Sequence, residues 1–330
     1  MIEKRLSIRG RRKLTEPAVY AGVVVILSLF PLFIKSPYLI HIFILTLIYI
    51  IAAASLRLIT TSGQFPLAHA AFMGIGAYTS AVVAKELGWI PWLTIPLGGL
   101  MAMGIGVLIG YPFARLRALY YAMVSLFFGA GIIQVIAVFP RWTGSYSGLT
   151  VIPPLLHVTT SKVPYYYFFL GLTVLCLLAL YRFEFCRIGT TLKAIAQSYL
   201  VASSVGINEA RYRVLALAVG CFFVGLAGAT YAHYNSTISP DAFNLLATLW
   251  LFMYVLIGGI ESFAGPIIGV ALLIIIPELF RGLKEFVPYI SAAILLIVVF
   301  VMPQGLAGFP QLVRSRIIER RKGKMVNHAS

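Results

Sequence analysis

Long apolar stretches recur along the chain, separated by short polar or basic segments. A membrane-spanning helix needs roughly twenty mostly apolar residues, and ten stretches approach that length. They are 17–34, 38–56, 64–84, 89–110, 118–139, 164–181, 214–234, 243–260, 263–277 and 286–303. The ninth is short for a complete span and is predicted to be tilted or partly re-entrant. The pattern therefore predicts an all-α integral membrane protein with about ten transmembrane helices.

Composition agrees with this prediction and excludes an ordinary soluble domain. Of 330 residues, 60% are hydrophobic and 11% are charged, and the mean hydropathy is +0.94. A soluble domain of this length carries far more charge. The net charge of +16 does not indicate nucleic-acid binding, because Lys and Arg lie at the chain ends and between apolar stretches. Basic tails at 1–16 and 311–330 are predicted to flank a transmembrane domain at 17–310 and to face acidic lipid headgroups.

The distribution of Lys and Arg also predicts an orientation. With the N-terminus in the cytoplasm, 20 of the 26 Lys and Arg fall in cytoplasmic segments and 6 in outer loops. This asymmetry favours ten spans with both termini in the cytoplasm. Ten spans divide into two sets of five, and the odd number in each set predicts an inverted repeat of five plus five, a plan common in transporters.

The third stretch opens with the sequence GQFPLAHAAFMGIGAY at 63–78. Its polar residues and proline predict an interrupted helix, which at membrane depth is tolerated only against protein or a wet cavity. Its small residues permit close helix contact. Two interpretations stay open: the segment lines a translocation path, or it forms a tight helix crossing with an interfacial histidine. The candidate path residues are Gln64, Pro66, His69, Phe72, Gly74, Gly76 and Tyr78.

A basic, polar segment at 182–213 lies between long apolar stretches and is predicted to carry its own amphipathic helix. Thr190 is a candidate N-cap, and Gly206 suits the position just after the helix. Apolar residues between them form one stripe at helical spacing. With Lys193 as the only cation on its polar face, the helix is predicted to dock on a protein partner rather than on lipid. The residues singled out in this loop are Gly189, Leu192, Lys193, Ile195, Tyr199, Ala202 and Gly206.

A glycine-rich segment separates the eighth and ninth stretches. Gly258, Gly259, Gly265 and Pro266 predict a tight turn there, and a compact hairpin between helices is the simplest interpretation.

Several patterns are missing from the sequence. It contains no Walker A motif, and no apolar stretch has an Asp, Glu, Lys or Arg near its middle, where ion-coupled carriers usually keep such groups. The three cysteines form no metal-binding pattern, so neither a metal site nor a cofactor is expected. The chain is predicted to be a transporter rather than an enzyme, with an energy source in another protein.

Five motifs in order resemble one known family, over roughly residues 40–310. They are GQFPLAHAAFMGIGAY at 63–78, the loop IGTTLKAI at 188–195 continuing to GIN at 206–208, GLAGA at 225–229, the Gly258–Pro266 turn, and PEL at 277–279 with PQGL at 303–306. Together they resemble the permease subunits of branched-chain amino-acid ABC importers, the LivM/LivH family, and the LivM branch more closely.

The resemblance implies a type II ABC importer-like fold and a set of partners. Such a permease pairs with a second, homologous permease, two cytoplasmic ATPase subunits and an extracytoplasmic substrate-binding protein, in the inner (cytoplasmic) membrane of a bacterium or archaeon. ATP hydrolysis takes place in the ATPase subunits, and their movement reaches the permease through the loop at 182–213. Branched-chain amino acids, or related small amino acids and amides, are the implied cargo.

The sequence departs from the family pattern at three places. Pro66 and Ala68 replace the usual Ser and Gly, Ala196 and Tyr199 stand where an Arg and an acidic residue are common, and Glu261 stands where a small residue is usual. These departures leave the particular cargo open and predict a less electrostatic contact with the ATPase.

Two other classes of protein stay open. An ion-coupled secondary transporter needs an ionisable group in the membrane, for which His41 and His69 are the candidates. An integral-membrane transferase needs clustered His, Asp or Glu near one interface. The outer loop at 141–164 has Arg141, His157 and Lys162 but no acidic residue, which disfavours that class.

Overall fold

The computed structural model describes residues 36–116, 118–156 and 162–279, with isolated positions at 27–29, 31, 292 and 296. Both predicted tails, His157 and most of the predicted spans at 17–34 and 286–303 lie outside the described residues. Within them the chain is helical apart from one two-stranded ribbon, which confirms an all-α membrane architecture. The count of ten spans and the inverted repeat stay predictions.

Six segments of the described chain are long and apolar enough to cross a membrane. They are α2 (Pro37–Thr60), α4 (Pro91–Ala114), Leu119–Val138 within α5 (Ala118–Val138), α7 (Val163–Phe185), α10 (Glu209–Asn235) and Pro240–Gly258, which joins η2 (Pro240–Phe243) to α11 (Leu245–Gly258). The shorter elements are α3 (His69–Glu86), α6 (Pro140–Thr143), η1 (Ser145–Ser147), α8 (Arg187–Gln197), α9 (Tyr199–Ser204) and α12 (Gly265–Leu279).

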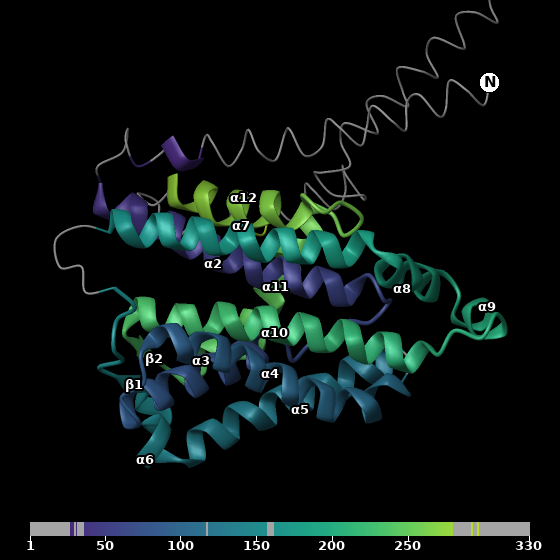
Figure 1. The fold of residues 1–330 in the computed structure, drawn as a ribbon, viewed down its shortest axis with the longest axis horizontal. Coiled ribbons are helices and arrows are strands. Elements are labelled where there is room, and N and C mark those ends of the chain that lie inside the picture. The colour runs from purple at the N-terminus through teal and green to yellow at the C-terminus, as the bar shows by residue number, and fades with distance from the viewer. Residues whose placement is uncertain are drawn as a thin grey trace, which may run out of the picture.

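The helices form one bundle whose two ends differ (Figure 1). Helix α10 packs against α3, α4 and α2, and α2 in turn contacts α7, α11 and α12. At one end, called here the ribbon end, β1 (Leu149–Thr150) pairs antiparallel with β2 (Thr237–Ile238), and Leu149 lies opposite Ile238. At the other end, called here the loop end, α8 and α9 project from the bundle (Figure 1).

Close backbone contacts hold α3, α4 and α10 together. A Cβ added to Gly76 would overlap the carbonyl oxygen of Gly225, and one added to Gly98 would overlap the carbonyl oxygen of Gly76. Small residues at helix crossings let backbones approach and gain van der Waals contact, which is the main attraction between helices in lipid. Gly76 therefore has a packing role, as one of the two interpretations of its motif predicted.

Two helices begin part of the way along the bundle rather than at one of its ends. After α2 ends at Thr60, residues 61–68 are non-helical and fold back, and α3 starts at His69. The His69 Nε2 atom lies 3.0 Å from Ser55 Oγ and 3.2 Å from the Ala52 carbonyl oxygen. These positions lie about 8 to 12 Å along α2 from its last residue. The predicted interruption of the third span is thereby confirmed.

A similar return occurs at the ribbon end. After α10 ends at Asn235, residues 236–244 fold back through β2 and η2, and α11 starts at Leu245. The first turns of α3 and α11 meet inside the bundle, where the backbone N–H of Ala70 donates to Thr248 Oγ1 at 3.0 Å. Since α3 runs toward the ribbon end and α11 toward the loop end, the two broken helices point in opposite directions.

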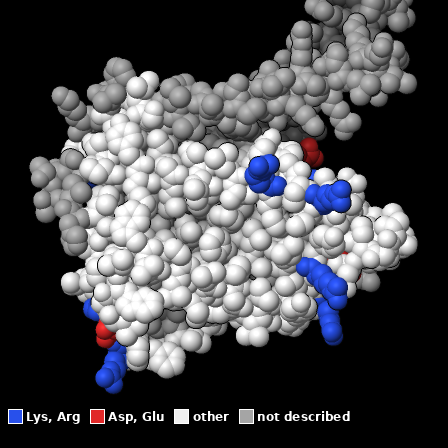
Figure 2. Space-filling view, viewed as in Figure 1, with Lys and Arg blue, Asp and Glu red and all other residues white. Residues whose placement is uncertain are grey.

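The surface is what a lipid environment requires. Large apolar side chains are exposed along α4 and α5, including Leu108 at 76% and Phe127 at 73% of full exposure. Monomeric soluble proteins rarely expose contiguous apolar patches of this kind. On the face drawn in Figure 2, Lys and Arg gather toward the two ends and leave a broad uncharged region between them.

Candidate functional site

The basic loop contains two helices rather than one. Helix α8 begins at Arg187 after an N-cap at Cys186, so the predicted N-cap at Thr190 is wrong. The helix is interrupted at Ser198, which has an extended backbone. Its side chain accepts a hydrogen bond from the Val201 N–H and so caps α9. A serine oxygen at this position satisfies an N–H that the first turn leaves free. The predicted stripe is therefore divided between two helices.

Gly206 closes the second helix of the loop, in the position that the sequence predicted for it. Gly206 has φ +82°, its N–H donates to the Ser203 carbonyl, and the Ile207 N–H donates to the Ala202 carbonyl. This pair of bonds is the Schellman motif, in which a left-handed residue closes a helix. Gly206 thus ends α9 as the sequence predicted.

The apolar stripe of α8 faces its own chain. Leu192 and Ile195 are 0% and 2% exposed, and a Cβ added to Gly189 would overlap the carbonyl oxygen of Glu184 at the end of α7. These residues seat α8 against the bundle, and they are covered before any partner arrives. Around α9, by contrast, Leu200 and Val201 are each 64% exposed, and Val205 is 71% exposed.

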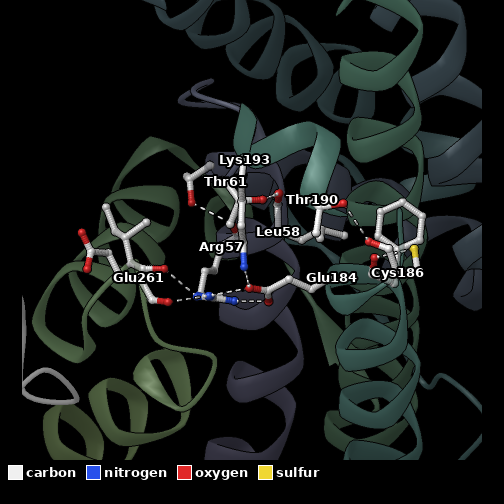
Figure 3. A network of polar contacts seen from close by, with 11 residues as sticks. Arg57, Leu58, Thr61, Glu184, Cys186, Thr190, Lys193 and Glu261 are labelled. Atoms are coloured by element: carbon white, nitrogen blue, oxygen red, sulfur yellow. Dashed lines mark hydrogen bonds and ion pairs between the residues drawn. The ribbon is translucent and has the colours of Figure 1, made fainter. Parts of the chain in front are cut away.

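A cluster of three charged residues, two of them buried, lies where α8 meets the ends of α2 and α7 (Figure 3). Glu184, in the last turn of α7, is 2% exposed and accepts hydrogen bonds from Arg57 Nη1 at 2.5 Å and Arg57 Nη2 at 2.9 Å. Lys193 of α8 donates to the same carboxylate at 2.8 Å. We call Arg57, Glu184 and Lys193 the charge cluster. It ties α2, α7 and α8 together by their side chains.

Arg57 also reaches the turn between α11 and α12. Its Nε donates to the Ile260 carbonyl at 2.7 Å, and its Nη2 to the Glu261 carbonyl at 3.3 Å. Glu261 takes part through its backbone, while its side chain is exposed and points away from the cluster (Figure 3). One guanidinium, 2% exposed, therefore joins three segments of the loop end, which are α2, α7 and the α11–α12 turn.

The turn itself is as tight as predicted. Gly259 has φ +103°, which a residue with a Cβ rarely adopts. A Cβ on Gly258 would overlap the carbonyl oxygen of Gly265, the first residue of α12, and Pro266 follows within the first helical turn, where a missing N–H costs nothing. The turn holds the Ile260 and Glu261 carbonyls where Arg57 meets them.

Sequence reasoning missed this cluster. Arg57 is one of the Lys and Arg whose distribution predicts the orientation, and Glu184 is not among the residues predicted to be functional. The available signals were weak: Arg57 is flanked by Leu56 and Leu58, and Glu184 stands between Phe183 and Phe185. A charge surrounded by apolar residues is buried only when it is paired, but sequence alone does not name the partner 127 positions away.

The candidate path residues lie deep in the bundle. Gln64 and His69 are 2% and 0% exposed, and their Nε2 and Nδ1 atoms respectively have no hydrogen-bond partner among the described residues. Phe72 packs against Phe128. The remaining members of the set are buried too, Tyr78 with its ring against Phe243; they are Pro66, Gly74, Gly76 and Tyr78.

The two histidines considered for ion coupling contact only uncharged groups among the described residues. His41 Nδ1 lies 2.6 Å from the Tyr234 hydroxyl, and His69 Nε2 lies near Ser55 and the Ala52 carbonyl. Among the residues that the structure describes, neither histidine contacts a carboxylate.

A bundle of apolar helices, two of which begin inside it, with a charged loop tied to one end, defines a polytopic membrane permease. The chain belongs to the family described as "Branched-chain amino acid transport system / permease component", whose model matches residues 38–303. It is accordingly a permease subunit of an ABC importer, and the resemblance seen in its motifs is confirmed.

Individual relatives agree with the family. The "High-affinity branched-chain amino acid transport system permease protein LivM" of Escherichia coli (strain K12) is 28% identical over 289 residues, which cover 79% of this chain and 68% of the relative. The corresponding LivH of the same organism is 32% identical over 143 residues, which cover 42% of this chain and 46% of the relative. A "Probable branched-chain amino acid transport permease protein LivM" of Methanocaldococcus jannaschii is 21% identical over 231 residues. No solved structure matches the chain.

Proposed function

We propose that the chain translocates branched-chain amino acids, or related small amino acids and amides, as one permease of an importer driven by separate ATPase subunits. The observation that carries this proposal is the charge cluster, which connects the loop helix α8 to the ends of α2, α7 and α11. Inside a family member, that arrangement provides a mechanical link between a soluble motor and the membrane helices.

The loop end is the proposed cytoplasmic side, in the inner membrane of a bacterium or archaeon, with both termini in the cytoplasm. The excess of Lys and Arg in the segments assigned to that side supports this orientation. The basic tails at 1–16 and 311–330 then face acidic lipid headgroups, and residues 17–310 form the permease domain.

The proposed fold has ten spans arranged as an inverted repeat of five plus five. Its support is the likeness between two parts of the chain: α2, the return at 61–68 and α3, and later α10, the return at 236–244 and α11. Each part has a long helix, a non-helical return and a shorter helix that begins inside the bundle, and the two parts run in opposite directions. This is the arrangement expected of inverted repeats with broken helices.

The proposed ATPase contact is the tip of the loop. Leu200, Val201 and Val205 are exposed around α9, which projects beyond the bundle in Figure 1. Exposed apolar side chains on a short helix are typical anchors for a groove in a protein partner. In this proposal α8, with Gly189, Leu192, Lys193 and Ile195, transmits movement, and the segment from Tyr199 through Ala202 to Gly206 receives it.

The remaining partners are a second, homologous permease, a second ATPase subunit, an extracytoplasmic substrate-binding protein and the lipid bilayer. The segment from Gln64 to Tyr78 is the proposed part of the translocation path. The unpaired Gln64 and His69 nitrogens support it, because buried polar atoms without a protein partner commonly bind water or a polar ligand.

The test is co-purification and uptake with the complete set of subunits in proteoliposomes. We expect Leu200→Asp combined with Val205→Asp to release the ATPase and abolish ATP-driven uptake of leucine, isoleucine and valine. Leu87→Asp is the matched control, because Leu87 is also 64% exposed but follows α3 at the ribbon end. Retention of the ATPase by the double variant would exclude α9 as the docking element, and absence of uptake by the wild-type complex would refute the proposed cargo.

A further inference from the structure

A cavity of about 250 Å³ lies where the two broken helices meet α5. Leu67 borders it just before α3 and Ala71 from the first turn of that helix, while Asn244 caps α11 and Leu245 and Thr248 lie in its first turn. Helix α5 completes the wall with five residues, Leu126, Gly129, Ala130, Ile133 and Gln134. The cavity therefore lies at the junction of the two proposed repeats, where transporters built from broken helices place their cargo.

One part of the lining is polar. Asp241 of η2 contributes a carboxylate and forms no ion pair within the part of the chain that the structure describes. The Tyr146 hydroxyl donates to Gln134 Oε1 at 2.7 Å, which leaves the two amide hydrogens of Gln134 free to donate elsewhere. A negatively charged hydrogen-bond acceptor, the Asp241 carboxylate, and a neutral hydrogen-bond donor, the Gln134 amide, thus border the same small space.

The rest of the lining is apolar. Leu67, Leu126, Ile133 and Phe243 present hydrocarbon to the cavity. Burial of an aliphatic side chain against such a wall is favourable in proportion to the area removed from water. A ligand that fits both parts of the lining has a compact apolar body and a polar end with a positive charge.

We propose that this cavity binds the translocated amino acid, with its ammonium group at Asp241, its carboxylate at the Gln134 amide and its aliphatic side chain against Leu67, Leu126 and Ile133. The N–H group of Leu245, which lines the cavity and which the helical pattern leaves without an intrahelical acceptor, adds a donor beside the carboxylate. The assignment rests on the proposed cargo of the permease and gives it a site within this subunit. The site discriminates by charge, since a cation and an anion on one small ligand each find a partner.

Cysteine labelling tests the site without depending on transport. Ala130 lines the cavity and is exposed, so the fold should tolerate a cysteine at this position. Of the native cysteines, only Cys186 is exposed and is replaced by serine, since Cys176 and Cys221 are buried. In membranes that contain the complete transporter, leucine at about ten times its Kd is expected to slow maleimide labelling about tenfold by mass action.

Two further measurements identify the contacts. The keto acid of leucine, which lacks the ammonium group, is expected to protect at least about tenfold more weakly. Asp241→Asn is expected to weaken leucine protection by about tenfold or more, the effect of losing a charge-assisted hydrogen bond. The control for the loss of charge is Glu86→Gln, at the exposed end of α3. The control for labelling is Val135→Cys, because Val135 is 58% exposed and lies on α5 like Ala130. Both controls should leave their readouts unchanged.

The outcomes separate this proposal from the proposed function. Protection of Ala130→Cys that requires Asp241 supports the site, whether or not uptake is seen. Wild-type uptake of leucine without protection at Ala130→Cys overturns the site and leaves the importer intact. Protection that is equal for leucine and its keto acid, or unchanged in Asp241→Asn, overturns the assignment of the ammonium to Asp241. Absence of both uptake and protection overturns both proposals.

Discussion

Replacing Glu184 by glutamine measures how strongly the charge cluster stabilises the loop end. Glu184 and Arg57 are each 2% exposed, so the substitution leaves a buried guanidinium without its counter-charge. Removing one partner of a buried ion pair typically costs about 3 to 5 kcal/mol. Arg57 keeps its bonds to the Ile260 and Glu261 carbonyls, and Lys193, 41% exposed, turns to solvent. We therefore expect a loss at the lower end, about 3 kcal/mol.

The double variant Arg57→Met with Glu184→Met separates stability from coupling. Replacing a buried pair by apolar residues of similar volume is often neutral or stabilising, so this variant should recover most of the stability lost in Glu184→Gln. It cannot rebuild the link between α8 and the α11–α12 turn, because that link consists of the hydrogen bonds of Arg57 and Glu184. We expect a folded, stable permease whose complex hydrolyses ATP with little uptake.

The assay is thermal inactivation of the purified complex in detergent, followed by the ratio of leucine uptake to ATP hydrolysis in proteoliposomes. Glu209→Gln is the matched control, because Glu209 pairs with Arg213 at 3.4 Å and is 32% exposed. This pair is partly exposed, and i,i+4 helix pairs contribute about 0.3 to 0.5 kcal/mol, far less than a fully buried pair. If Glu184→Gln and Glu209→Gln lower stability equally, the cluster is not the stabilising element inferred here. If the Met–Met variant couples normally, the cluster does not transmit movement.

Three further predictions concern packing, the end of the loop and orientation. Gly76→Ala should prevent assembly, measured by gel filtration, because its Cβ meets a neighbouring backbone, whereas Gly104→Ala, which meets nothing within 4 Å, should behave like wild type. Gly206→Val should destabilise the loop by about 1 to 2 kcal/mol, because φ is +82° there, and limited proteolysis should cut it faster. Cysteines placed at Ser147, near the ribbon end, and at Ser330 should be labelled from the outside and the inside respectively, and the reverse pattern would refute the orientation.

The interruption of the third span was predictable because its cause is local. Gln64 and Pro66 oppose a continuous helix, and the glycines that follow mark close packing. The matching interruption before α11 has similar signals in 235–244, where Ser, Thr, Pro and Asp cluster. The expected spans at 214–234 and 243–260 leave this segment only as a connection, because hydropathy alone does not distinguish a turn at the surface from one that folds back into the bundle.

The charge cluster and the division of the loop were not predictable in the same way. The pairing of Arg57 with Glu184 depends on how α2 and α7 pack, which no window of sequence contains. The break at Ser198 depends on a small preference for capping over helix continuation, which the apolar spacing of Leu192, Ile195 and Tyr199 concealed. Spacing identified an amphipathic segment correctly but did not show that Leu192 and Ile195 face the bundle.

The charge cluster and the cavity lie at opposite ends of the same short helix. Helix α11 has 14 residues and is about 21 Å long. Its first turn lines the cavity through Leu245 and Thr248, and the carbonyls just after its last turn are held by Arg57.

If α8 has the coupling role proposed above, its movement displaces Lys193 and Glu184, and these residues displace Arg57. Helix α11, acting as a rigid element, then carries the displacement to the cavity. A path drawn through a structure is only a hypothesis until two sites are shown to bias one element. The labelling rate of Ala130→Cys supplies that test, since ATP should change it in the wild-type background and leave it constant when Arg57 and Glu184 are both methionine. A nucleotide effect of equal size in both backgrounds would mean that movement enters the membrane by another route, and α11 would then be a fixed wall of the cavity.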